Sequence, residues 1–184
     1  MVQVRFHGRG GQGVVTSAEL LSLAAFIDGR HAQAFPSFGS ERTGAPIQAF
    51  CRIDDRPIRA HEPIAQPDVL VVQDPTLLHQ VDLFSGLATT GHVVLNSSRT
   101  AEELGVHELA ARIHTVPATE IARRHLGRTL PGTALLGALA ALTSIVSRAA
   151  LEAAIAERFS SRLAAGNTAA ADAGWEHAGG GVHA

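Results

Sequence analysis

Apolar residues occur along this chain in short runs, separated by longer stretches in which they recur at helical spacing. Short runs rich in Val, Ile, Leu and Phe predict β-strands. The predicted strands cover residues 2–6, 31–35, 47–53, 69–72, 93–95 and 112–116. Residues 69–72 are apolar throughout, which is typical of a strand buried on both faces of a parallel sheet. Residues 47–53 instead alternate apolar and polar side chains.

The stretches between these runs predict helices. The predicted helices cover residues 14–26, 76–86, 100–110, 118–126, 133–159 and 161–177. Asp28-Gly29 predicts the end of the first helix, and Ser147 predicts an N-cap where the stretch 133–159 divides into two helices. Alternating strands and helices predict an α/β fold. We expect a three-layer α/β/α sandwich with a mostly parallel or mixed sheet and a helical C-terminal part.

Composition narrows the class of protein. The 184 residues are 46% apolar, enough for one domain, which we place at residues 1–178 with a flexible tail at 179–184. A net charge of −2 provides no basic surface for nucleic acid. No apolar stretch approaches the roughly 20 residues that span a membrane, and no signal peptide opens the chain. We therefore expect a cytoplasmic protein.

Two further features of composition exclude particular chemistries. Cys51 is the single cysteine, which excludes an internal disulfide, a cysteine-based zinc site and a self-held iron–sulfur cluster. All 15 cationic side chains are arginine, so neither a Schiff-base lysine nor a P-loop lysine is present. The ten histidines lack ligand spacing, and we predict no metal site; His7 is the one histidine beside a candidate site.

The segment Gly8-Arg9-Gly10-Gly11-Gln12-Gly13 joins the first predicted strand to the first predicted helix. Three interpretations are open: a tight turn that needs glycine conformations, an anion site at a helix N-terminus, and a dinucleotide site of the G-x-G-x-x-G type. The strand at 31–35 ends in Pro36 and not in the acidic residue that binds ribose in dinucleotide folds. The long side chains of Arg9 and Gln12 also crowd the turn, which weakens the dinucleotide interpretation.

A second candidate is the loop between the predicted strands at 31–35 and 47–53. It places an aromatic side chain, an acid and an arginine together, and functional residues are common on such loops. The candidates in it are Ser37, Phe38, Glu41 and Arg42. A solvated Glu–Arg pair is the alternative explanation for the last two.

Several separated motifs fall in the order found in one family. They are Gly8-Arg9-Gly10-Gly11-Gln12-Gly13, Ala32-Gln33-Ala34-Phe35-Pro36-Ser37-Phe38-Gly39-Ser40-Glu41-Arg42, Gly44-Ala45-Pro46, Pro57-Ile58-Arg59, Pro67-Asp68-Val69 and Gln73-Asp74-Pro75-Thr76-Leu77-Leu78. On these motifs the chain resembles, over about residues 2–160, the gamma subunit of the 2-oxoacid:ferredoxin oxidoreductases. Gly44-Ala45-Pro46 favours the pyruvate and ketoisovalerate type over the 2-oxoglutarate branch.

This resemblance implies a role within a larger enzyme. The family decarboxylates a 2-oxoacid on thiamine diphosphate with Mg, transfers the acyl group to coenzyme A and passes electrons through iron–sulfur clusters to ferredoxin. Its alpha and beta subunits hold the thiamine cofactor, and a delta subunit holds most clusters. The gamma subunit is a scaffold that contributes to the coenzyme A region. The resemblance thus implies partner subunits, no cofactor held by this chain alone and no catalytic residue of its own.

The resemblance also suggests roles for residues. We expect Gly8, Arg9, Gly10, Gly11, Gln12, Gly13 and Thr133 to form the cofactor-binding part. Backbone donors of the glycines would meet a coenzyme A phosphate or a partner carboxylate, with Arg9 reinforcing the contact. We expect Ser37, Phe38, Glu41 and Arg42 at a subunit interface near the thiamine site. A free-standing Rossmann-type dinucleotide-binding oxidoreductase is the alternative function.

The chain departs from the family pattern at three places. Gly132 precedes Thr133 where the family usually has asparagine, Ser147-Arg148-Ala149-Ala150 replaces a Leu-Glu-Ser turn, and Gly166-Asn167 replaces a lysine–asparagine pair. These differences bear on contacts with coenzyme A or a partner, and they fit a substrate other than pyruvate, such as an aromatic or branched 2-oxoacid.

Overall fold

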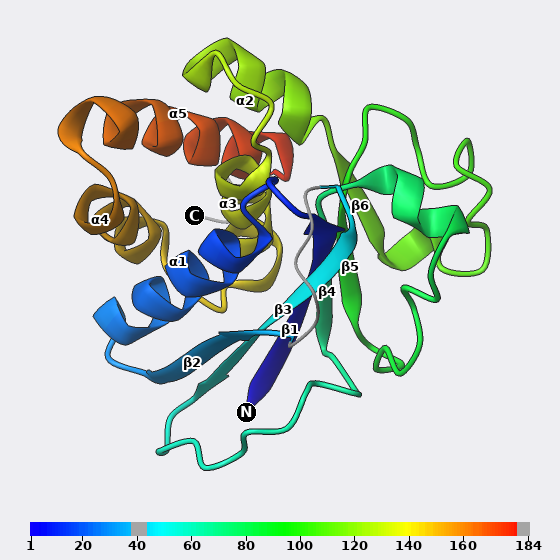
Figure 1. The fold of residues 1–184 in the computed structure, drawn as a ribbon, viewed down its shortest axis with the longest axis horizontal. Coiled ribbons are helices and arrows are strands. Elements are labelled where there is room, and N and C mark those ends of the chain that lie inside the picture. The colour runs from blue at the N-terminus through cyan, green and yellow to red at the C-terminus, as the bar shows by residue number, and fades with distance from the viewer. Residues whose placement is uncertain (38–43, 180–184) are drawn as a thin grey trace.

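The computed structural model describes residues 1–37 and 44–179, which form one mixed sheet with helices packed against it (Figure 1). The strands are β1 (Val2–Arg9), β2 (His31–Pro36), β3 (Pro46–Asp54), β4 (Val69–Val72), β5 (His92–Asn96) and β6 (Ile113–Val116). The α-helices are α1 (Val14–Ile27), α2 (Ala118–Leu126), α3 (Gly132–Thr143), α4 (Arg148–Arg158) and α5 (Ser161–His177). Two 3-10 helices are η1 (Pro75–His79) and η2 (Ala110–Arg112).

The sheet has six strands in the order β2-β3-β1-β4-β5-β6. Strands β1, β4, β5 and β6 are parallel, whereas β3 is antiparallel to both β1 and β2. Helix α1 therefore carries the chain over β3 from β1 to β2. The carboxyl ends of β1, β4, β5 and β6 meet at one edge, and the start of β3 lies there too, because Arg9 pairs with Pro46. The predicted α/β class with a mixed sheet is confirmed.

The two faces of the sheet are covered differently. One face packs against the α-helices in a core that includes Phe6, Leu21, Ile53 and Leu135, all at most 2% exposed. The other face, on β4, β5 and β6, packs against the segment between residues 75 and 112, which the ribbon shows as loops and short helical turns (Figure 1). The second covering layer thus contains no α-helix among the described residues.

Two predicted helices are therefore wrong. Residues 76–86 form η1 and then turns, and residues 100–110 form turns up to η2. In the first segment the chain turns after η1, and the carbonyl oxygens of Leu83 and Ser85 face Arg5 Nη2, from which they accept at 2.9 and 2.8 Å. In the second segment Gly105 has a φ of +77°, which ends helical geometry.

The remaining helix predictions are confirmed, including their ends. Gly29, with a φ of +79°, follows the Asp28 C-cap of α1. Ser147 Oγ accepts from the amide of Ala150 at 3.1 Å and caps α4. The same serine donates from its hydroxyl to Asp28 at 2.7 Å, which joins the end of α1 to the start of α4.

Helices α3 and α5 cross at a very short distance. A Cβ at Gly137 would collide with the carbonyl oxygen of Ala171, and one at Gly174 would collide with that of Ala134. Glycine at 174, which weakens α5 by propensity alone, is therefore required by packing. Among the described residues no helix is long and apolar enough to cross a membrane. Residues 180–184 of the predicted tail lie outside the described ranges.

Candidate functional site

The glycine-rich segment forms the turn between β1 and α1. Gly11 and Gly13 have φ values of +92° and +75°, so both adopt the left-handed region that favours glycine. Gly13 is the N-cap of α1, with no side-chain cap and no acidic residue in the first turn. Within the part of the chain that the structure describes, the first amides of α1 therefore have no side-chain acceptor, which is the condition for binding an anion at a helix N-terminus. A hollow of about 250 Å³ lies over this turn.

The crevice between the carboxyl ends of β1 and β4 is filled by the protein's own side chains. Arg9 Nε donates to Asp74 Oδ2 at 3.1 Å, and Gln12 Nε2 donates to the same oxygen at 2.9 Å. Gln12 Oε1 in turn accepts from the Arg9 amide at 2.8 Å. This position is where doubly wound α/β sheets place a nucleotide. Here it holds a closed hydrogen-bonded network instead.

The Arg9 guanidinium makes further contacts at this edge. Nη2 donates to Thr76 Oγ1 and to Gln80 Oε1, both at 2.8 Å, and Nη1 donates to the Gly44 carbonyl at 3.0 Å. Arg9 therefore fastens the glycine turn to η1 and to the chain that enters β3. The guanidinium nitrogens of Arg9 thus donate to acceptors within the protein.

Asp74 is the centre of this network. Its Oδ1 accepts from the Thr76 amide at 3.0 Å and from the Thr76 hydroxyl at 2.6 Å, so it also caps η1. Burial alone raises the pKa of Asp74. The hydrogen bonds from Thr76 and Gln12 and the charge of Arg9 outweigh that effect and hold the pKa below its usual value. The carboxylate is thus charged at neutral pH.

The second predicted loop lies next to the glycine turn. The Gly10 amide donates to the Ala45 carbonyl at 3.0 Å, and the Gly44 amide donates to the Gly10 carbonyl at 3.2 Å. The Ser37 amide donates to the Gln48 carbonyl at 2.9 Å on the same edge. Residues 38–43 lie outside the described ranges, and with them the predicted candidates Phe38, Glu41 and Arg42.

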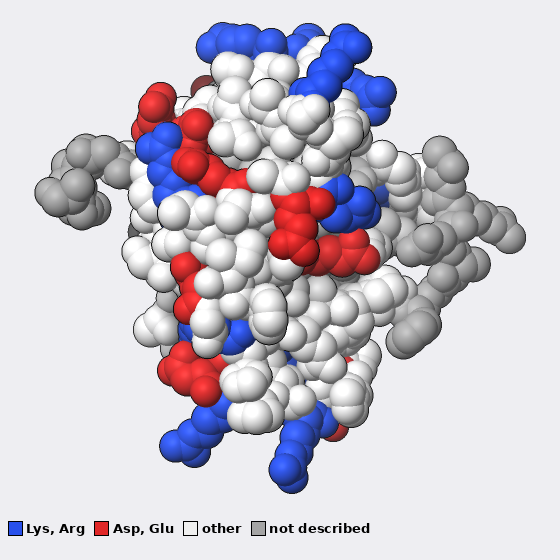
Figure 2. Space-filling view, turned by 90° about the vertical axis from the view of Figure 1, so that its left-hand side faces the viewer, with Lys and Arg blue, Asp and Glu red and all other residues white. Residues whose placement is uncertain are grey.

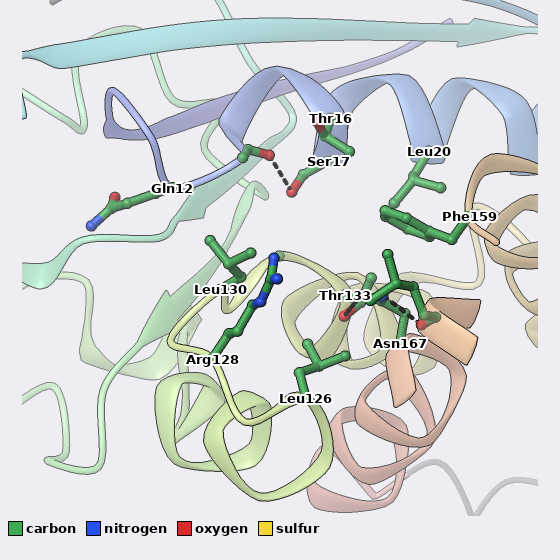
Figure 3. A pocket seen from close by; sticks show the side chains of 13 residues that line it. Gln12, Thr16, Ser17, Leu20, Leu126, Arg128, Leu130, Thr133, Phe159 and Asn167 are labelled. Carbon is green, nitrogen blue, oxygen red and sulfur yellow. Dashed lines mark hydrogen bonds between the residues drawn. The ribbon is translucent and has the colours of Figure 1, made fainter. Parts of the chain in front are cut away.

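A cavity of about 170 Å³ lies on the other side of the turn, between α1, the α2–α3 connection and the start of α5 (Figure 3). Its wall is mostly apolar, with Leu20, Leu126, Leu130, Phe159 and Leu163. Its polar lining includes Gln12, Thr16, Ser17, Arg128, Thr133 and Asn167. The structure therefore brings together Gln12, Gly13 and Thr133, three of the predicted site residues.

Hydrogen bonds hold two walls of this cavity. Buried Thr133 donates from its hydroxyl to Asn167 Oδ1 at 3.1 Å. Ser17 Oγ accepts from Gln73 Nε2 at 2.7 Å. A Cβ at Gly132 would collide with Ser17 Oγ, so the departure from the family pattern at Gly132 is matched to the serine opposite it.

Burial shifts the pKa values of two titratable groups, His7 and Cys51. His7 Nε2 accepts from Arg5 Nε at 3.0 Å, and burial, with the neighbouring Arg5 charge, lowers the pKa of His7 to about 3. Burial raises the pKa of the Cys51 thiol far above its usual range. Among residues 1–37 and 44–179, no group of three His, Cys, Asp or Glu side chains could hold a metal ion.

Sequence reasoning missed most of the cavity wall and the role of Asp74. A signal for Asp74 exists, because Asp-Pro-Thr after a strand is a helix-capping pattern. The cavity has no such signal, because it joins side chains from α1 with others more than a hundred positions later.

The fold and this edge together define a mixed-sheet α/β domain with a glycine turn before its first helix and with Arg9, Gln12 and Asp74 in the crevice between β1 and β4. Residues 3–177 match the family model described as pyruvate ferredoxin/flavodoxin oxidoreductase. The chain is 47% identical over 178 residues to the pyruvate/ketoisovalerate oxidoreductases common subunit gamma of Thermococcus litoralis, covering 96% of each chain. It is also 47% identical over 176 residues to the pyruvate synthase subunit PorC of Methanothermobacter marburgensis, covering 96% of this chain and 97% of that one.

A solved structure agrees with these relatives. The crystal structure of the pyruvate oxidoreductase subunit PORC from Thermotoga maritima superposes with a TM-score of 0.81 at 36% identity and covers 95% of both chains. The chain therefore belongs to the pyruvate ferredoxin/flavodoxin oxidoreductase family, and it is a gamma-type member of that family. The resemblance drawn from the motifs is confirmed.

Proposed function

We propose that this chain is the gamma subunit of a multi-subunit, thiamine-diphosphate-dependent 2-oxoacid:acceptor oxidoreductase that forms an acyl-coenzyme A. The observation that carries the proposal is full-length similarity to gamma and PorC subunits, together with the filled nucleotide crevice. Partner alpha, beta and delta subunits hold thiamine diphosphate, Mg and the iron–sulfur clusters, and electrons leave to ferredoxin or another acceptor. The substrate is pyruvate or another 2-oxoacid, aromatic or branched.

The residues of this chain support a scaffold role. One buried cysteine cannot ligate a cluster, which needs several thiolates. Buried His7 and Arg5 are hydrogen-bonded to each other, and Arg5 also donates to the Leu83 carbonyl. The free-standing dinucleotide-binding oxidoreductase is not favoured, because Arg9, Gln12 and Asp74 fill the crevice between β1 and β4 and β2 ends in Pro36 in place of an acidic residue for the ribose.

We assign the contribution to the coenzyme A region to the backbone of the glycine turn. The uncapped N-terminus of α1 and the open hollow over Gly10, Gly11 and Gly13 suit an anionic phosphate. Arg9 acts as a positioning residue, since its donors are engaged by Asp74, Thr76 and Gln80. The neighbouring Ser37 and the segment with Phe38, Glu41 and Arg42 are assigned to the interface near the thiamine site.

A carboxylate placed in the first turn of α1 tests this assignment. Thr16→Asp puts a negative charge at the helix N-terminus, which favours the helix but repels a phosphate. In the assembled complex we expect the KM for coenzyme A to rise on the order of tenfold, with the KM for the 2-oxoacid unchanged. Thr16→Asn is the neutral control. An unchanged KM for coenzyme A in Thr16→Asp would refute the phosphate assignment and leave the turn a packing element.

A further inference from the structure

The 170 Å³ cavity beside α1 has the size of one large side chain. Drug-sized ligands occupy about 300–1,000 Å³, whereas an apolar cavity of about 150 Å³ takes a benzene molecule. Its wall is apolar, and its rim carries Leu130 and Leu163, which are 36% and 44% exposed. Among the described residues, these are two of six large hydrophobic side chains that face solvent. An exposed apolar rim around a preformed cavity is typical of a site that binds an anchor residue in a protein interface.

One arginine lines this cavity, and three more lie on the helices α2 and α5 that form its wall. Figure 3 shows the Arg128 guanidinium beside Leu130, pointing across the cavity toward α1. Arg123 and Arg124 lie on the last turn of α2, and Arg162 lies at the start of α5, next to Leu163. In the part of the chain that the structure describes, none of these four arginines forms an ion pair.

The four arginines lie on neighbouring elements of the chain. Helix α5 packs on the end of α2, where a Cβ at Gly166 would lie 2.9 Å from the His125 carbonyl, so the arginines of both helices belong to one surface. The acidic residue of α2, Glu120, lies in its first turn at the opposite end. On the side of the molecule drawn in Figure 2, basic side chains lie along the top, at the level of α2, and both acidic and basic side chains lie lower down.

We propose that the cavity and these arginines form a docking site for a segment of a partner subunit that carries one large apolar side chain next to Asp or Glu residues. The apolar side chain fills the cavity, and the carboxylates pair with Arg128 and its neighbours. Charge complementarity selects this occupant, because a bare apolar anchor leaves the arginines desolvated and unpaired. This docking site rests on the proposed subunit role, and it is the surface through which the chain binds a partner subunit.

Photo-cross-linking in the assembled complex tests the docking site. p-Benzoylphenylalanine at position 163 is expected to cross-link to one partner subunit, at a peptide with a large apolar residue within a few positions of Asp or Glu. The same group at position 26, where Phe26 is 71% exposed at the end of α1, is the control and should not reach that peptide. A complex that assembles but gives no partner cross-link from position 163 would overturn the docking site. Absence of any partner chain would instead overturn the subunit role itself.

Charge reversal supplies a second test with the purified partner subunits. Arg128→Glu is expected to weaken association by about 10- to 100-fold and to reduce its dependence on salt. Arg56→Glu, at an exposed arginine outside the family motifs and without an ion pair in the described residues, is the matched control and should change association less than twofold. Equal effects of the two variants would contradict the proposal. Suppression of the cross-link from position 163 by coenzyme A or a 2-oxoacid in the assembled complex would also contradict the proposal, because the cavity would then be a small-molecule site.

Discussion

Arg9 and Asp74 are 65 positions apart in the chain, yet their side chains join the ends of two neighbouring parallel strands through an Nε–Oδ2 hydrogen bond of 3.1 Å. Their side chains are 23% and 12% exposed, so the pair is largely withdrawn from solvent. Gln12 and Thr76 complete the shell around the carboxylate. The pair thus closes the crevice that other α/β folds leave open for a ligand.

Removing this carboxylate should destabilise the domain. Asp74→Ala removes the acceptor for Arg9, Gln12 and both donors of Thr76, and we expect a loss of about 3 kcal/mol in the free energy of unfolding. Asp55→Ala is the control, since Asp55 pairs with Arg30 while 83% exposed, and its cost should be about 0.5 kcal/mol or less. Urea denaturation measures both. Equal losses would mean that the network contributes no more than a surface pair.

His7 should make the stability depend on pH. Its pKa is about 3 in the folded chain and 6.5 as the ordinary value, so below pH 6.5 the unfolded chain binds a proton that the folded chain does not. Stability from this group is therefore full at pH 7 and falls with pH down to about 3. Between pH 7 and pH 5 we expect a loss of about 2 kcal/mol.

The variant His7→Gln isolates this effect. Glutamine can accept the Arg5 hydrogen bond, but it does not titrate. Denaturation of both proteins at pH 7 and pH 5 should show a smaller loss for the variant by about 2 kcal/mol. Parallel pH profiles for the two proteins would show that His7 is protonated in the folded state, contrary to its burial.

The α3–α5 crossing should not tolerate one added methyl group. Gly174→Ala places a Cβ against the Ala134 carbonyl, where only backbone movement can relieve the collision. We expect a loss of about 2–3 kcal/mol despite the better helix propensity of alanine. Ala165→Val enlarges an exposed residue of the same helix and should cost less than about 1 kcal/mol. A stabilised Gly174→Ala protein would disprove the close approach.

Cys51 should be inert in the folded chain. It is fully buried, and burial raises the pKa of its thiol, so thiolate is scarce at neutral pH. Labelling with a thiol reagent at pH 7 should proceed only after denaturant is added. Rapid labelling of the folded protein would contradict the burial of β3 in the core.

The sequence predicts local structure well where one signal decides it. The caps at Asp28-Gly29 and Ser147 predict helix ends, and the runs at 69–72 and 112–116 predict strands that the structure contains. The helices predicted at 76–86 and 100–110 are wrong: the first segment turns after η1 and places Leu83 and Ser85 against the distant Arg5, and Gly105 interrupts the second with a positive φ. Contacts between residues far apart in the sequence do not change the spacing of apolar residues, so the sequence pattern does not reveal them.

The candidate site is predictable only in part. The glycine turn follows from its own residues, since Gly11 and Gly13 adopt positive φ. The Arg9 side chain donates hydrogen bonds to Asp74 and Gln80, and both of these acceptors are remote from it in the sequence. The expectation that Arg9 meets a phosphate came from its place in the turn, and the turn itself does not show where the side chain points.

The mass and composition of the protein purified gently from its own source test the central claim most directly. We expect the chain to elute in a complex with larger partner chains that carries thiamine diphosphate and iron and reduces an acceptor when given a 2-oxoacid and coenzyme A. A lone monomer or self-dimer that retains NAD(P) or FAD would contradict it and would restore the dinucleotide-binding enzyme.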